Sequence, residues 1–380
     1  MKTLNIPCFF LVVFLNSCEF SDKSQNLGKQ FLPKIKSVQL PLDEKSTYEF
    51  FIYQVVGDSL LVLNQVNYSV DIYSLSEEKL KRRIHVEREG LNGLERLNTF
   101  HYHNQDSIFL FRQFQLNNSL IVDINGNVID RIQHNEFKSD IDGLINHVGT
   151  PLMPTILIED ELHFTVFQMT DESIENHDFT YEHSLNIKSG DFTSYPYIKK
   201  PKSFHNNRWV NETFSRIKID KEEWYFSWNL SDSVYHILGK DGVLNQSKPI
   251  ALNGVIATNP EPVPKNSYKE YWPKMMAESY VYGKILFDND NNVLHRIRYL
   301  PIIPSPTFNL STIDPYLNKN FEILTHTLDG EFLGSTEFKS GTYDPRVLFM
   351  GPDGIYLPKI HPSYEGLNED EIVYDVFNIQ

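Results

Sequence analysis

Cysteine is almost absent from this chain of 380 residues, which contains only Cys8 and Cys18. Both lie near the N-terminus, so the rest of the chain cannot form a disulfide and must be stabilised by core burial alone. A hydrophobic content of 41% and an aromatic content of 13% are ample for a packed core and argue against disorder. Long apolar runs are also lacking, because no segment approaches the roughly 20 residues of a membrane-spanning helix.

Basic residues are fewer than acidic ones, 35 against 50, which gives a net charge of −15. A field of this sign disfavours nucleic acid and anionic membrane surfaces as partners. Signatures of catalysis are missing too: the sequence has no Gly-x-Ser-x-Gly elbow, no P-loop, no dinucleotide fingerprint and no Ser-x-Asp-x-Gly box of the sialidase type. We therefore expect no cofactor and nominate no catalytic residue. Whether the protein is an enzyme stays open, with a non-enzymatic role favoured.

The N-terminus predicts export. Lys2 precedes an apolar segment, residues 4–15, that is too short to span a bilayer and is typical of a signal peptide. The segment ends in Leu15-Asn16-Ser17-Cys18, which resembles a bacterial lipobox, where the cysteine thiol takes a diacylglycerol and becomes the mature N-terminus. Asn16 departs from the commonest lipobox, so a plain signal peptide is the alternative. Lipidation of Cys18 would anchor the protein in the cell envelope, with the outer membrane expected, facing either the periplasm or the exterior.

Internal repeats are the most informative feature of the sequence. A short strand with a serine near its start, then a turn and another strand, recurs with serines spaced by 50, 65 and 49 residues, at Ser69, Ser119, Ser184 and Ser233. In the last three copies a glycine follows where a tight hairpin requires a positive φ, at Gly126, Gly190 and Gly242. A second turn-initiated hairpin precedes each copy, so that each repeat holds two hairpins.

Two hairpins make four antiparallel strands, which is one blade of a β-propeller. Residues 280–299 and 321–338 supply two hairpins of one blade across a proline-rich connection, while the last repeat, residues 347–377, is one strand short. Residues 34–40 can supply that strand and so remove an exposed sheet edge. The sequence therefore predicts an all-β fold, a propeller of about six four-stranded blades closed by an N-terminal strand that joins the C-terminal blade, with few helices.

The predicted organisation has three parts, in chain order: a lipoprotein signal peptide at residues 1–17, a flexible polar tether at residues 18–30, and a single propeller domain at residues 31–380. The strongest local motifs are Glu89-Gly90-Leu91-Asn92-Gly93-Leu94 and the pair formed by residues 282–288 and 295–299. Together with the repeats, they resemble the six-bladed propeller-like lipoproteins of Bacteroidetes-type bacteria, the family known as domain of unknown function 4221. The resemblance implies a fold and an envelope location and carries no activity.

Two short motifs have the spacing of metal ligands. His101-Tyr102-His103 places two imidazoles on one face of a strand, but no third ligand accompanies them, so ordinary blade residues are the preferred interpretation. Asp288-Asn289-Asp290-Asn291-Asn292 begins like a calcium loop, yet Val293 and Tyr299 stand where an EF-hand needs glycine and glutamate. A polar hairpin turn is preferred there, and no metal site is predicted.

Aromatic and arginine side chains in long loops are the candidate ligand-binding residues, because such side chains stack and form hydrogen bonds at low entropic cost. They are Tyr271 and Trp272 in the proline-rich segment 258–276, Arg208 and Trp209, and Arg346. Packing between blades is the alternative role for them. We expect ligands to be recognised through the aromatic segment and not through an acidic channel wall.

The sequence thus favours a cell-envelope lipoprotein that acts as a propeller binding module for a glycan, a peptide or a partner protein. The alternative is an envelope hydrolase or lyase with its site at the mouth of the propeller channel. The membrane is the remaining predicted partner, through the lipid anchor.

Overall fold

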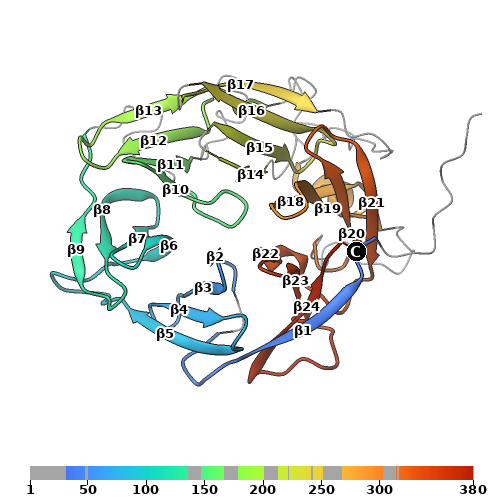
Figure 1. Cartoon of the computed structure of the whole chain (residues 1–380), viewed down its shortest axis with the longest axis horizontal. Coiled ribbons are helices and arrows are strands. Elements are labelled where there is room, and N and C mark those ends of the chain that lie inside the picture. The colour runs from blue at the N-terminus through green and yellow to red at the C-terminus, as the bar shows by residue number, and fades with distance from the viewer. Residues whose placement is uncertain are drawn as a thin grey trace, which may run out of the picture. The chain divides into compact units, whose positions relative to one another are not determined.

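The repeated strand-and-turn segments form six four-stranded antiparallel sheets arranged in a ring, as the computed structural model shows (Figure 1). The structure describes residues 31–47, 50–135, 147–166, 179–200, 213–220, 222–240, 243–250, 268–302, 314 and 316–379. Residues 31–380 form one compact unit. Each sheet is one blade, so the predicted six-bladed β-propeller is confirmed.

Five of the blades consist of consecutive strands. Blade 1 contains β2 (Tyr53–Val56), β3 (Ser59–Asn64), β4 (Ser69–Ser74) and β5 (Lys79–His85). Blade 2 contains β6 (Leu97–Asn104), β7 (Ser107–Arg112), β8 (Gln115–Val122) and β9 (Val128–Arg131). Blade 3 contains β10 (Ile156–Ile158), β11 (Glu161–Thr165), β12 (Glu182–Asn186) and β13 (Phe192–Tyr195).

The second half of the ring follows the same order. Blade 4 contains β14 (Phe214–Lys218), β15 (Glu223–Trp228), β16 (Val234–Lys240) and β17 (Val243–Ile250). Blade 5 contains β18 (Val281–Asp288), β19 (Val293–Tyr299), β20 (Phe321–Thr327) and β21 (Phe332–Phe338). Blade 6 contains β22 (Phe349–Gly351), β23 (Gly354–Pro358), β24 (Glu371–Phe377) and the N-terminal β1 (Lys34–Pro41). One strand of each blade lies nearest the ring centre, and these six strands are β2, β6, β10, β14, β18 and β22 (Figure 1).

Strand β1 closes the ring by pairing antiparallel with β24, from Lys34 opposite Phe377 to Pro41 opposite Glu371. Val38 and Leu40 of β1 are fully buried in a cluster with residues of blades 1 and 6. At the start of the strand, the Lys34 ammonium lies 2.7 Å from the Asp375 carboxylate. The predicted closure is therefore confirmed, and it gives β24 a partner on its outer edge.

The turns follow the predicted glycines. Gly126 and Gly190 have φ angles of +83° and +77°, a region that favours glycine because it has no Cβ. In the first repeat, Glu78 takes a φ of +52° in place of a glycine. Gly242 lies outside the described residues.

The hydrophobic core lies between neighbouring blades and is rich in aromatic side chains. Trp224 and Trp228 of β15 are completely buried. The Trp228 ring meets the Tyr181 ring of the neighbouring blade edge-on, with centroids 5.4 Å apart. Trp228 therefore packs between blades.

One helix, α1 (Tyr268–Glu278), departs from the expected loop between residues 258 and 276. Pro273 lies inside it, and because a proline there removes a helical hydrogen bond, no helix was expected in this segment. Tertiary contacts compensate. Met276 and Ala277 are buried, and the Lys319 ammonium donates hydrogen bonds to the carbonyls of Met276 and Ser279 at the helix end.

Candidate functional site

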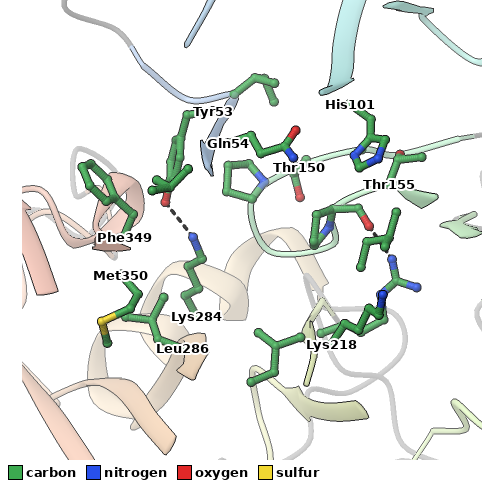
Figure 2. A pocket seen from close by; sticks show the side chains of 18 of the residues that line it. Tyr53, Gln54, His101, Thr150, Thr155, Lys218, Lys284, Leu286, Phe349 and Met350 are labelled. Atoms are coloured by element: carbon green, nitrogen blue, oxygen red, sulfur yellow. Dashed lines mark hydrogen bonds between the residues drawn. The ribbon is translucent and has the colours of Figure 1, made fainter. Parts of the chain in front are cut away.

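The first strands of all six blades surround a central cavity of about 450 Å³. Its walls also include residues 149–155, which precede β10. Figure 2 shows the side chains on two sides: Tyr53, Lys284 and Phe349 gather on one, and His101, Thr155 and Lys218 on the other. A cavity at the meeting point of all blades is a common place for a ligand, because every blade can contribute a side chain to it.

The segment before β10 reaches from blade 3 into the centre of the ring (Figure 1). Its main chain is fixed by Arg216 of β14, whose N–H donates to the Leu152 carbonyl at 2.8 Å and whose guanidinium donates to the Pro154 carbonyl. Thr150 and Pro151 line both the central cavity and a second hollow of about 370 Å³. The segment is thus a wall between the two spaces.

Arg216 is held in place by Glu182 of β12, with which it forms a completely buried ion pair. Burial raises the pKa of the Glu182 carboxyl, and the neighbouring Arg216 charge opposes that effect. The guanidinium also stacks on Trp224, 4.7 Å from the ring centroid. Although Arg216 lines the cavity, its charge is compensated, so its main role is to hold blade 3, blade 4 and the central segment together.

Lys284 reaches the cavity because β18 contains a β-bulge. Tyr282 pairs with Arg298 and Ile285 with Arg296, so Gly283 and Lys284 together stand opposite one partner residue. A Cβ on residue 283 would lie 3.1 Å from the Tyr299 ring, which leaves little room for any residue but glycine. The bulge re-aims the Lys284 side chain across the inner end of blade 6 toward Tyr53 of blade 1 (Figure 2).

The Lys284 ammonium has no carboxylate partner among the described residues. Its Nζ donates to the Tyr53 hydroxyl at 2.7 Å and approaches the Leu348 carbonyl at 3.5 Å, while Tyr53 itself donates to that same carbonyl. Nζ also lies 4.6 Å from the centroid of the Tyr53 ring. Burial lowers the pKa of Lys284 to about 7, so the amine is partly uncharged at neutral pH.

The opposite side of the cavity carries a neutral imidazole. The His101 Nε2 accepts a hydrogen bond from the Leu157 N–H at 3.3 Å. Burial first, and then the charges of His103 and Lys218, lower the pKa of His101 to about 3. The His103 ring lies 6.4 Å away and is exposed. Within the described ranges, no group of three or more His, Cys, Asp or Glu side chains is placed to hold a metal ion.

The charged side chains that line the described cavity are all basic: Arg216, Lys218 and Lys284. No aspartate or glutamate belongs to this lining set, although the whole chain carries a net charge of −15. The described lining of the cavity is therefore not acidic, and recognition through the aromatic segment stays a prediction.

The candidate residues from the sequence lie in different places. Arg346, in the short 3₁₀ helix η4 (Pro345–Val347), lines the second hollow, where its guanidinium lies 2.7 Å from Asp344 and 3.1 Å from Asp314. Tyr271 and Trp272 belong to α1 and not to a loop. The other three lie outside the described residues: Arg208, Trp209 and Cys18.

The calcium-like segment is a hairpin turn between β18 and β19, as preferred from the sequence. The Asp288 carboxylate accepts hydrogen bonds from the N–H groups of Asp290 and Asn291, each at 3.0 Å. Burial raises the pKa of Asp288, but the nearby His295 and the hydrogen bonds from Asn291 outweigh this effect and hold the pKa below its usual range. Its oxygens thus stabilise the turn.

Comparison with known proteins settles the family. The chain matches the family described as a domain of unknown function, DUF4221, over residues 34–309. It belongs to the DUF4221 family. A member of that family from Bacteroides vulgatus has a similar structure, with a TM-score of 0.76 and 18% sequence identity over 93% of this chain and 99% of the other. The resemblance seen in the sequence is confirmed.

A more distant structural relative is a protein from Bacteroides fragilis that is inferred to be exported. It has a TM-score of 0.51 and 11% identity over 92% of this DUF4221 chain and 96% of its own. At such identities the likeness shows the fold alone. No curated protein matches the chain. In the part of the chain that the structure describes, no helix is long and apolar enough to cross a membrane.

The sequence did not single out Lys284 of this DUF4221 protein as a site residue. A signal was present, because a lysine stands beside Ile285 and Leu286 in an otherwise apolar strand and follows a glycine. Both features fit a bulged inner strand. Its proximity to Tyr53, 231 residues earlier in the chain, depends on ring closure and has no local signature.

Proposed function

We propose that this protein is a lipid-anchored binding module of the cell envelope that holds a small acidic ligand, such as an acidic sugar, in its central cavity. The observation that carries the proposal is the charge of the cavity lining: among the described residues, Lys284 lines the cavity with no carboxylate partner, and no aspartate or glutamate belongs to the lining. An anion entering this site would meet Lys284, which has no carboxylate partner, in surroundings where water screens charges poorly.

The apolar lining supports a ligand with a hydrocarbon or sugar-ring face. Phe100, Phe287 and Phe349 contribute aromatic carbon to the walls, and aromatic rings pack well against sugar rings. A cavity of about 450 Å³ has the size of pockets that take small molecules. Of the glycan, peptide or partner protein expected from the sequence, the proposal selects a small ligand with an acidic group that fits inside the ring.

The envelope location rests on the N-terminal sequence. The lipobox-like residues ending at Cys18 support a lipid anchor, and the exported relative from Bacteroides fragilis is consistent with that location. A tether at residues 18–30 would then let the propeller stand away from the membrane.

Paired ligands test the proposal. Galacturonate and galactose differ by one carboxylate, and isothermal titration should show that the acidic sugar binds at least about tenfold more tightly, which corresponds to one charge-assisted interaction of about 1.4 kcal/mol. The preference should fall in Lys284→Met and persist in Lys81→Met, which removes an exposed lysine of β5 outside the cavity. Equal binding of both sugars, or an unchanged preference in Lys284→Met, would overturn it.

The pH dependence gives a second readout. An anion favours the charged form of Lys284, and the pKa of its amine is about 7. Below pH 7 the amine is already protonated, so binding should be tightest there. Above pH 7 binding requires uptake of a proton, so the affinity should decrease as the pH rises.

A further inference from the structure

We propose that Lys284 is a nucleophilic amine that forms an imine with a carbonyl-bearing ligand in the central cavity. The inference rests on the proposed function only for the place where the ligand binds. It adds a covalent step, and it applies to ligands with an aldehyde or keto group, whether or not they are acidic.

The position of Lys284 satisfies the first requirement of such an amine, which is access from a cavity and protection from bulk water. Its side chain is only 9% exposed, yet it belongs to the cavity wall. Around it lie Leu286 and Phe349, which are apolar. The bulge at Gly283 positions the backbone of Lys284, and the hydrogen bond to the Tyr53 hydroxyl directs the amine.

The second requirement is that nothing holds the amine permanently charged. Groups that face this side of the cavity are Tyr53 from β2 and, across the cavity, Lys218 and Arg216 from β14 and His101 from β6. None of these is a carboxylate, and burial without a carboxylate partner disfavours the charged form of the amine. The buried Asp344 acts on Tyr53 and is not a partner of the amine. Tyr53 accepts one N–H of Lys284 at 2.7 Å, which leaves the lone pair of the uncharged amine free to point elsewhere.

Comparison with Lys319, another buried lysine with a lowered pKa, distinguishes the arrangement at Lys284 from a purely structural one. Lys319 donates to two carbonyls, those of Met276 and Ser279, at the end of α1, and it does not belong to the wall of the cavity. Burial lowers the pKa of Lys319 to about 7 as well. The two lysines therefore share a lowered pKa and differ in access, which makes Lys319 an internal control.

The step balances without a further reactant. The Nζ lone pair attacks the carbonyl carbon, a C–N bond forms, and the C=O π electrons move to oxygen, which takes up a proton while nitrogen loses one. The carbinolamine then expels its hydroxyl group with a proton as water, and the imine C=N forms; an N–H proton returns to solvent. Tyr53 is a positioning residue, because its hydroxyl oxygen holds one N–H of the amine.

Reductive trapping tests the proposal on the mature full-length protein. The probes are glyoxylate, an acidic aldehyde, and glycolaldehyde, a neutral one, each with cyanoborohydride, which delivers hydride to the imine carbon and leaves a stable secondary amine. Peptide mass spectrometry then measures modification at Lys284, Lys319 and the exposed Lys81. We expect Lys284 to be modified at least about tenfold faster than Lys81 at pH 7, because an ordinary lysine is almost entirely protonated there.

Two variants and one pH series complete the design. Tyr53→Phe should lower the trapping rate at Lys284 several-fold without changing that at Lys81, and Lys284→Met should remove the fast-reacting site while Lys319 stays unmodified. The trapping rate of Lys284 should rise with pH and level off above about pH 7 to 8 as the amine loses its proton. Modification of Lys284 no faster than that of Lys81, with either probe, would refute the inference.

The two probes separate this inference from the proposed function. Fast trapping by glycolaldehyde without a preference for glyoxylate would support the nucleophilic amine and contradict an acidic ligand. A preference for galacturonate over galactose without any fast trapping would support the acidic ligand and contradict the nucleophilic amine.

Discussion

Replacing Lys284 by methionine should stabilise the folded protein at neutral pH. The lysine is buried without a carboxylate, and burial lowers its pKa from 10.5 to about 7. One pKa unit corresponds to about 1.4 kcal/mol, so at pH 7 the buried lysine lowers the free energy of unfolding by about 4 kcal/mol relative to an unperturbed one. Methionine has a similar length, no charge and a flexible chain that fits the apolar wall.

Part of that gain is offset by a lost contact. The variant gives up the hydrogen bond from Nζ to the Tyr53 hydroxyl, which contributes about 1 kcal/mol, while Tyr53 keeps its bond to the Leu348 carbonyl. The net expectation is that Lys284→Met raises the free energy of unfolding by about 3 kcal/mol at pH 7. A site that keeps a destabilising lysine is consistent with a functional role for that lysine.

The sign of the pH dependence provides the sharper test. The pKa of Lys284 in the folded state is below its value in the unfolded state. The wild type therefore loses stability as the pH falls from 10.5 to about 7, and below pH 7 Lys284 causes little further change in stability. The advantage of the variant should therefore shrink by about 2 kcal/mol between pH 7 and pH 9. Lys319 has the same pKa shift but is present in both proteins, so its contribution cancels.

Urea unfolding followed by tryptophan fluorescence, at pH 7 and pH 9, measures these differences if the m-values of the two proteins agree. Lys81→Met, which removes an exposed lysine of β5, is the matched control and should change stability by no more than about 0.5 kcal/mol at either pH. The argument would be refuted if Lys284→Met were less stable than the wild type. It would also be refuted if the gain in free energy of unfolding were the same at pH 7 and pH 9.

Three further predictions concern the N-terminal residues and helix α1. Cys18→Ala should move the protein from the membrane to the soluble envelope fraction, because the acyl chains provide the attachment; fractionation with fatty-acid labelling checks this. Deletion of residues 31–40 should lower the free energy of unfolding by about 5 kcal/mol or more, since it removes the buried Leu32, Val38 and Leu40 and exposes an edge of β24; an unchanged melting temperature would contradict it. Trp272→Ala tests the segment that the sequence favoured for ligand binding: because Trp272 does not belong to the described lining of the central cavity, the variant should bind galacturonate as tightly as the wild type, whereas a loss of about 2 kcal/mol in binding at an unchanged melting temperature would place the site at α1.

The blade architecture was predictable because its determinants are local. Turn residues such as Gly126 and Gly190, and the alternation of short strands, repeat along the chain at the spacing of one blade. The closing strand could be predicted as well, because a blade that lacks one strand needs a partner and residues 34–40 are free to supply it. Helix α1 could not, because Pro273 opposes it and its stability comes from contacts such as that with Lys319.

The fold class, the number of blades, the closure of the ring and the family could all be inferred from the amino-acid pattern. The charge and shape of the cavity could not, because they depend on how distant strands come together. A net charge of −15 describes the whole chain, while the charge of the cavity lining depends on the few side chains that the innermost strands direct toward the centre. The pairing of Lys284 with Tyr53 joins blades 5 and 1 across blade 6, and it exists only because the closed ring and one β-bulge bring these strands together.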